Sequence, residues 1–253
     1  MKGFLRAILL LGLVGTLAAF LWRLVRRPTP GHRVGLNGSS RAVSEEVIGE
    51  GRLRTAASYL DEGNVYFNVG QYELAIERYT RALEETPSIP AALYNRATAH
   101  TRLGDFDEAL VDFNATIELT PSDIDALNNR GMLRLYRSEP GEALADFEQA
   151  LALNPEDTTV IVNRGLAQLE TESHKEAFAS FEEATRLGPE DAFAHYGAAQ
   201  AAAGLGKRKV ALRYLKEALE LQPAYATEAA SDTKLALLDG DDEFMKLLRR
   251  GAE

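Results

Sequence analysis

The strongest constraint on the fold is one fixed spacing that recurs through most of the chain. Prolines keep this spacing without a slip, at Pro87, Pro121, Pro155, Pro189 and Pro223. Four further columns keep the same register, and their members are mostly small or aromatic. They are Ala75, Ala109, Ala143, Ala177 and Ala211; Tyr79, Phe113, Phe147, Phe181 and Leu215; Ala82, Thr116, Ala150, Ala184 and Ala218; and Gly63, Ala97, Gly131, Gly165 and Ala199. A fixed period of this length indicates an array of one repeated supersecondary unit.

A helix–turn–helix unit with these columns resembles the tetratricopeptide repeat. The resemblance implies an all-α, right-handed α-solenoid over residues 45–225, with repeats at 56–89, 90–123, 124–157, 158–191 and 192–225. The Gly and Ala columns mark positions where two helices approach closely, and the aromatic column fills the space between adjacent repeats. Each proline ends the second helix of its repeat. One repeat cannot bury its apolar face alone, so stacking of neighbours supplies the core.

After Pro223 the repeat columns are no longer recognisable. Residues 226–253 are predicted to be a capping segment of two short helices, since Leu235 and Leu238, then Phe244 and Leu247, are spaced for helical faces. Asp241 or Asp242 is expected to cap the second of these helices. A solenoid needs such a segment at its end to stay soluble.

The N-terminus is predicted to be a membrane anchor, residues 1–27. Residues 7–22 carry no charge, and the window from Phe4 to Val25 is long enough to span a bilayer. Trp22 stands where an interfacial aromatic residue is expected. A cleaved signal peptide is the alternative, but the apolar run is long for one and arginines follow it. Residues 28–44 are rich in Pro, Gly and Ser and are predicted to be a flexible linker.

The orientation of this predicted span is weakly specified. Four arginines follow it, whereas Lys2, Arg6 and the free amine precede it, which slightly favours a cytoplasmic body. A periplasmic or luminal body is the alternative. The span has a small-residue face that is able to pair two spans into a homo-oligomer, formed by Gly12, Gly15, Thr16 and Ala19. Small residues are also common in unpaired spans, so a monomeric span is the alternative.

The composition excludes several classes of function. The residues after position 33 carry all 38 acidic side chains of the chain, so nucleic acid phosphates would repel the body. The chain has no cysteine, which excludes disulfides and thiolate metal sites. No nucleophile elbow, zinc-helix motif or phosphate loop occurs. We therefore expect no enzymatic activity, no cofactor and no metal. His100 and His195 fall near core positions and are predicted to be structural.

The resemblance implies that the first helix of each repeat lines a concave groove where a protein or peptide binds. The predicted groove residues are Leu60, Asn64, Phe67, Tyr94, Asn95, Thr98, Asn128, Asn129, Met132, Tyr136, Val162, Asn163, Leu166, Phe193 and Tyr196. This lining is largely aromatic and aliphatic. Members of the family that clamp acidic chaperone tails use two Asn and three basic residues. Here Leu60, Asp125 and Asn129 replace the bases, so charge-assisted bonds to a carboxylate are missing. We exclude that class of partner.

An asparagine ladder recurs within the groove at Asn95, Asn129 and Asn163. It is similar to the ladder that grips peptide backbone in O-linked N-acetylglucosamine transferase, because an amide offers both a donor and an acceptor. The other interpretation is that these residues only connect neighbouring helices. Three contacts of about 1 kcal/mol fall short of the roughly 8 kcal/mol of micromolar binding. The groove's aromatic residues must supply the rest. The adjacent Arg96, Arg130 and Arg164 are predicted to brace neighbouring helices or to pair with carboxylates.

These features predict a single-pass, membrane-anchored scaffold or adaptor whose groove holds a partner protein at a membrane, for example in complex assembly or protein targeting. The alternatives are a self-assembling structural protein and an exported protein with a cleaved signal peptide.

Overall fold

The computed structural model describes residues 55–251, and every regular element in this range is a helix. The predicted anchor and linker lie outside the described residues. Among the residues that are described, no helix combines the length and the apolar character that a membrane crossing requires. The chain divides into two compact units, with the boundary between Ala109 and Leu110.

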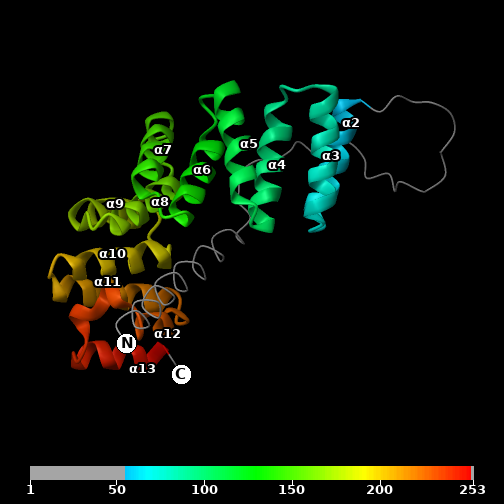
Figure 1. Cartoon of the computed structure of the whole chain (residues 1–253). Helices are drawn as coiled ribbons and strands as arrows, with labels where there is room; N and C mark the ends of the chain where they lie inside the picture. Colours follow the sequence, from blue (N-terminus) through cyan, green and yellow to red (C-terminus); the bar gives the residue numbers. More distant parts are fainter. Residues whose placement is uncertain (1–54, 252–253) are drawn as a thin grey trace, which may run out of the picture. The chain divides into compact units, whose positions relative to one another are not determined.

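The helices alternate as first and second members of the repeats (Figure 1). The first helices are α2 (Ala56–Asn68), α4 (Pro90–Leu103), α6 (Ile124–Tyr136), α8 (Thr158–Glu170) and α10 (Ala192–Gly204). The second helices are α3 (Tyr72–Glu85), α5 (Phe106–Leu119), α7 (Pro140–Leu153), α9 (His174–Leu187) and α11 (Arg208–Leu221). Each helix packs against the next from α2 to α4 and from α6 to α11.

The helix ends follow from a few polar and proline positions. Asp123, Asp157 and Asp191 cap α6, α8 and α10, and their carboxylates accept backbone N–H bonds of 2.9–3.1 Å from the first turn. Each second helix ends two residues before a proline of the repeat column. The residue before a proline disfavours helical geometry, so the chain leaves the helix there.

The turns between paired helices repeat one backbone conformation. Six described residues have a positive φ, and each lies one repeat length from the next: Gly70, Gly104, Ser138, Glu172, Gly206 and Gly240. The φ angles of Ser138 and Glu172 are 61° and 56°. Only glycine adopts this region without a steric penalty. The third and fourth repeats therefore carry a small local strain that the others avoid.

Replacing Ser138 or Glu172 by Gly is expected to stabilise the protein. The native backbone already has a left-handed conformation, so relief of strain outweighs the added entropy of the unfolded glycine, by roughly 0.5–1 kcal/mol per site. Chemical denaturation followed by helical ellipticity measures this gain. The converse change Gly206→Ser should destabilise the protein. A loss of stability in both glycine variants would contradict the prediction.

The close approach of paired helices has a definite structural cause. A Cβ added to Gly63 would lie 2.5 Å from the Tyr79 ring, and one added to Gly131 would lie 2.6 Å from Phe147. Both rings are almost fully buried. In each pair the glycine lies on the first helix and the aromatic residue on the second helix of the same repeat. The aromatic column therefore fills space within the repeat, and Phe181 also reaches the next repeat, where a Cβ added to Gly197 would lie 2.4 Å from its ring.

The repeat register continues beyond the five predicted repeats. Gly240 has the turn conformation of Gly206, and the start of α13 (Asp242–Gly251) lies one repeat length after the start of α11. Before it, the place of a first helix is occupied by α12 (Tyr225–Ala229) and the 3₁₀ helix η1 (Thr233–Leu238). As predicted for this position, Asp241 caps α13, accepting the N–H of Glu243 at 2.8 Å. The C-terminal segment is thus an incomplete sixth repeat with a broken first helix.

Candidate functional site

The arginines beside the ladder brace the repeats, as predicted. Arg96 donates to Thr80 Oγ1 at 3.1 Å, and Arg164 donates to Ser180 Oγ at 3.0 Å. Arg130 forms two hydrogen bonds to Asp146, of 3.1 and 2.6 Å. In the third and fourth repeats these bonds join the first helix to the second helix of the same repeat. These side chains are therefore committed to internal contacts.

In the first two repeats, the predicted groove residues meet around Asn64. Asn95 Nδ2 donates to Asn64 Oδ1 at 2.8 Å, and the hydroxyl of Tyr79 donates to the same oxygen at 2.9 Å. Burial raises the pKa of the Tyr79 hydroxyl, which therefore stays protonated as a donor. The two bonds fix the orientation of the Asn64 amide, because turning it over would place one NH₂ group against another.

The neighbouring residues of this face are partly buried and come from α2 and α4. Leu60 and Phe67 pack beside the core around Tyr79, and the Phe67 ring meets Tyr72 edge-on at 5.4 Å. Tyr94 and Thr98 lie one turn apart on α4, where the Thr98 hydroxyl donates to the Tyr94 carbonyl at 2.9 Å. All four side chains keep some exposure to solvent.

The corresponding amides of the third and fourth repeats are closed off from solvent. Asn163 Nδ2 donates to Asn128 Oδ1 at 2.8 Å, but these residues are only 2% and 7% exposed. Oδ1 of Asn163 is buried and has no hydrogen-bond partner among the described residues. Asn95 and Asn163 therefore connect neighbouring first helices, which is the second of the two interpretations, whereas Asn95 and Asn129 remain partly exposed.

The remaining predicted groove residues separate into a buried and an accessible set. On α8 and α10 the side chains are at most 6% exposed: Val162, Leu166, Phe193 and Tyr196. On α6, Asn129 and Met132 are partly exposed, and Tyr136 is 43% exposed. A peptide is thus able to reach the face of α6 but not the equivalent face of the last two complete repeats.

The broken sixth repeat covers α10. The Tyr196 hydroxyl and the Gln200 amide both donate to Asp232 Oδ2, at 2.8 and 2.7 Å. The Tyr225 ring stacks on Tyr196 with 5.1 Å between centroids. Burial and the negative charge of Asp232 raise the pKa of the Tyr196 hydroxyl. The sequence patterns did not identify this cluster, although the spacing of Gly240 from Gly206 was a signal that the repeat continues.

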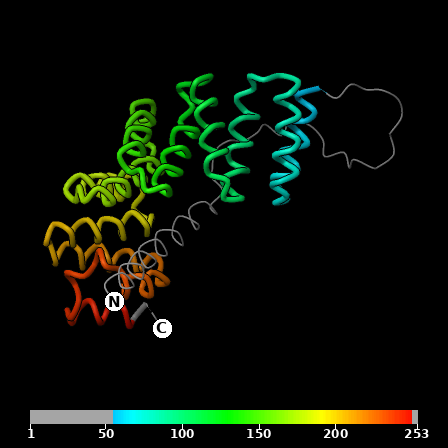
Figure 2. The backbone as a smooth tube through the Cα atoms, viewed as in Figure 1, coloured from blue at the N-terminus to red at the C-terminus, as the bar shows by residue number. Residues whose placement is uncertain are grey.

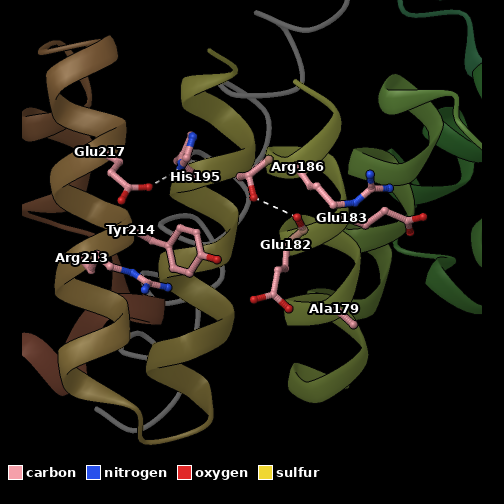
Figure 3. A pocket seen from close by; sticks show the side chains of 9 residues that line it. Ala179, Glu182, Glu183, Arg186, His195, Arg213, Tyr214 and Glu217 are labelled. Carbon is pink, nitrogen blue, oxygen red and sulfur yellow. Dashed lines mark hydrogen bonds and ion pairs between the residues drawn. The ribbon is translucent and has the colours of Figure 1, made fainter. Parts of the chain in front are cut away.

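A cleft lies between α9, α10 and α11 (Figure 3). This cleft of about 730 Å³ is lined by Ala179, Glu182, Glu183, Thr185, Arg186, His195, Arg213, Tyr214 and Glu217. His195 Nε2 lies 2.9 Å from the Pro189 carbonyl, and Nδ1 lies 3.0 Å from Glu217 Oε2 but outside hydrogen-bonding geometry. Glu183 pairs with Arg164 at 3.1 Å. His195 is therefore a buried residue that braces the repeat, as predicted.

Solved structures with the same arrangement of helices include other repeat proteins. MamA aligns with a TM-score of 0.63 and 23% identity over 69% of this chain and 95% of its own. MamA from Desulfovibrio magneticus RS-1 gives 0.63 and 22%, over 70% and 97%. YrrB, described as a TPR protein with an unusual peptide-binding site, gives 0.61 and 26%, over 73% and 91%. A comparison with curated proteins found no match.

Family models agree with the repeat register. One tetratricopeptide repeat model matches residues 60–124 and 128–192, which is half of the chain, and a second matches residues 194–225. The fold and the columns are those of a scaffold for protein–protein interaction. This chain belongs to the tetratricopeptide repeat family.

Proposed function

We propose that this protein is a non-enzymatic, membrane-anchored scaffold that holds an extended segment of a partner protein on the first helices of its N-terminal repeats. The observation that carries the proposal is the amide pair Asn64 and Asn95. Their mutual bond leaves the Asn64 Nδ2 and the Asn95 Oδ1 without a hydrogen-bond partner among residues 55–251. Both side chains are partly exposed.

This pair matches the chemistry of a peptide bond. A peptide group presents one carbonyl acceptor and one N–H donor. Asn64 Nδ2 is able to donate to a backbone carbonyl of the partner, and Asn95 Oδ1 is able to accept from a backbone N–H. One extended residue of the partner therefore forms both hydrogen bonds. The partly exposed Phe67 and Tyr94 lie on the same helices and supply apolar area. The peptide-binding site attributed to YrrB supports a peptide as the class of ligand.

The variant Asn95→Ala is expected to weaken partner binding about fivefold, which corresponds to about one net hydrogen bond. The readout is quantitative recovery of partners from solubilised membranes, using full-length chain with a photo-crosslinking residue at Thr98. Asn68→Ala, on an exposed position of α2, is the matched control. Equal recovery by the two variants would show that the amide pair does not hold the partner.

The membrane anchor is the part of this proposal that depends on the sequence alone. The apolar run from Phe4 to Val25 motivates it, and the charge distribution favours a cytoplasmic body. Protease digestion of the body in sealed membranes, with and without detergent, tests orientation. Extraction of the full-length chain by alkaline carbonate alone would refute the anchor.

Self-association is a second candidate, and it is favoured by an exposed apolar residue at a repeat position that is buried in the other repeats. Ala99, Leu133, Ala167 and Ala201 are at most 3% exposed, whereas Val65, the equivalent residue of the first repeat, is 62% exposed. Val69, one turn further, is 64% exposed. A second copy would bury this edge. Sedimentation of a purified body as a monomer at all concentrations would eliminate assembly through α2.

A further inference from the structure

Polar side chains that the repeat pattern does not explain join the C-terminal segment to α10. Tyr196 and Gln200 lie one turn apart on α10, and both donate to the same oxygen of Asp232. Asp232 also caps η1 by accepting the N–H of Lys234 at 2.9 Å. One carboxylate thus fixes the start of η1 and binds the face of α10 at the same time.

A charge pair extends this contact to the preceding repeat. Lys234 Nζ lies 3.0 Å from Glu170 Oε1 at the end of α8, and the two side chains are 30% and 28% exposed. Beside them, the Tyr225 ring stacks on Tyr196. The segment therefore spans the first helices of two repeats, as a bound peptide would. Figure 2 shows the chain turning back beside α10 and α11 after α11 ends.

The segment is also unlike an ordinary first helix. A regular helix at this position would run without a break, as α2 to α10 do, but here α12 ends at Ala229 and η1 begins at Thr233. The connecting Ala230 and Ser231 are exposed. Leu235 and Leu238 are fully buried, so apolar contacts also hold the segment in place. A competitor must replace both the polar and the apolar contacts.

We propose that residues 225–238 are an internal ligand of the face formed by Glu170, Tyr196 and Gln200. The face recognises a partner segment with the same chemistry: an aromatic residue, a carboxylate that accepts from the tyrosine and the amide, and a cation two residues beyond it. Such a segment displaces residues 225–238 and opens the last two complete repeats. This inference rests on the first helices being the binding face, as proposed above, but it concerns different residues.

A synthetic peptide of residues 223–240 is the probe, and full-length chain in detergent is the protein. The variant Asp232→Ala with Lys234→Glu removes the polar anchors of the internal segment. We expect it to bind the peptide about tenfold more tightly than the original chain does, since the competing internal contact is weakened. Amide exchange within residues 192–204 should rise by about tenfold as well.

A charge reversal serves as the matched control. Glu170→Lys combined with Lys234→Glu restores an opposite-charge pair, so exchange in residues 192–204 should return toward that of the original chain. If the first double variant loses helicity, Lys234→Glu alone gives the same readout at a partly exposed position.

Two outcomes would overturn the inference. Unchanged exchange in the opened variant would show that these contacts do not hold the face closed. Faster exchange without peptide binding would show that the segment is only an end cap. If Asn95→Ala still lowers partner recovery in either case, the proposed function stands and only the internal ligand is refuted.

Discussion

Replacing Asp146 by Asn is expected to destabilise the third repeat by about 3 kcal/mol, because it breaks a buried ion-pair network. Asp146 is 2% exposed and accepts from Arg130 at 3.1 and 2.6 Å and from Arg134 at 2.7 Å. The amide keeps the shape of the carboxylate but removes its charge. Two guanidinium groups, 14% and 22% exposed, then lose their counter-ion.

Chemical denaturation gives the total loss, and amide exchange localises it. Repeat arrays open in parts, so exchange in α6 and α7 should accelerate more than in α10 and α11. Glu142→Gln is the matched control, since Glu142 lies on the same helix with an exposed side chain. The control should change stability by at most about 0.5 kcal/mol. A loss below about 1 kcal/mol for Asp146→Asn would mean that solvent already screens both arginines.

The third repeat illustrates what the sequence allowed us to predict. The columns at Gly131, Ala143 and Phe147 predicted the family and an all-helical fold, because each column reflects a contact that every repeat makes. They also indicated that Arg130 braces its own neighbourhood. The partner Asp146 was not predictable from the column, since the same position holds Arg78 in the first repeat and Ser180 in the fourth. There the polar pairing changes: Arg78 faces Glu62 at 3.4 Å, and Ser180 accepts from Arg164.

The accessibility of the groove was less predictable, because it depends on a segment without recognisable columns. Four residues at groove positions are buried in the last repeats, although the repeat columns do not distinguish them from accessible ones: Val162, Leu166, Phe193 and Tyr196. The sixth repeat that covers Tyr196 has Thr233 where the small column continues and Arg249 where the aromatic column continues. Neither supports the glycine–aromatic contact of the earlier repeats. Its first helix is broken, and Asp232 reaches α10.

Gly197 on α10 meets the Phe181 ring of the preceding repeat, and this contact is tighter than the glycine–aromatic contacts within the repeats. Replacing Gly197 by Ala is expected to destabilise the protein by about 2–3 kcal/mol, because overpacking outweighs the roughly 1 kcal/mol that alanine contributes to a helix. The added Cβ would lie 2.4 Å from the Phe181 ring. That ring is fully buried, and a Cβ on Gly165 would lie 2.9 Å from it, so it has little room to move away.

Two further variants separate this steric effect from helix propensity. Gly141→Ala, at a helical position with no atom within 4 Å of the added Cβ, should be neutral or stabilising by up to about 1 kcal/mol. Phe181→Leu combined with Gly197→Ala should cost less than the sum of the single changes, by about 1 kcal/mol, since the smaller side chain leaves room for the methyl group. The fifth repeat makes a similar change at the contact within a repeat, where Ala199 and Leu215 replace the pair Gly165 and Phe181 and are both fully buried. If denaturation measurements show that the free-energy changes of Phe181→Leu and Gly197→Ala are strictly additive, the cost of Gly197→Ala does not come from contact with Phe181.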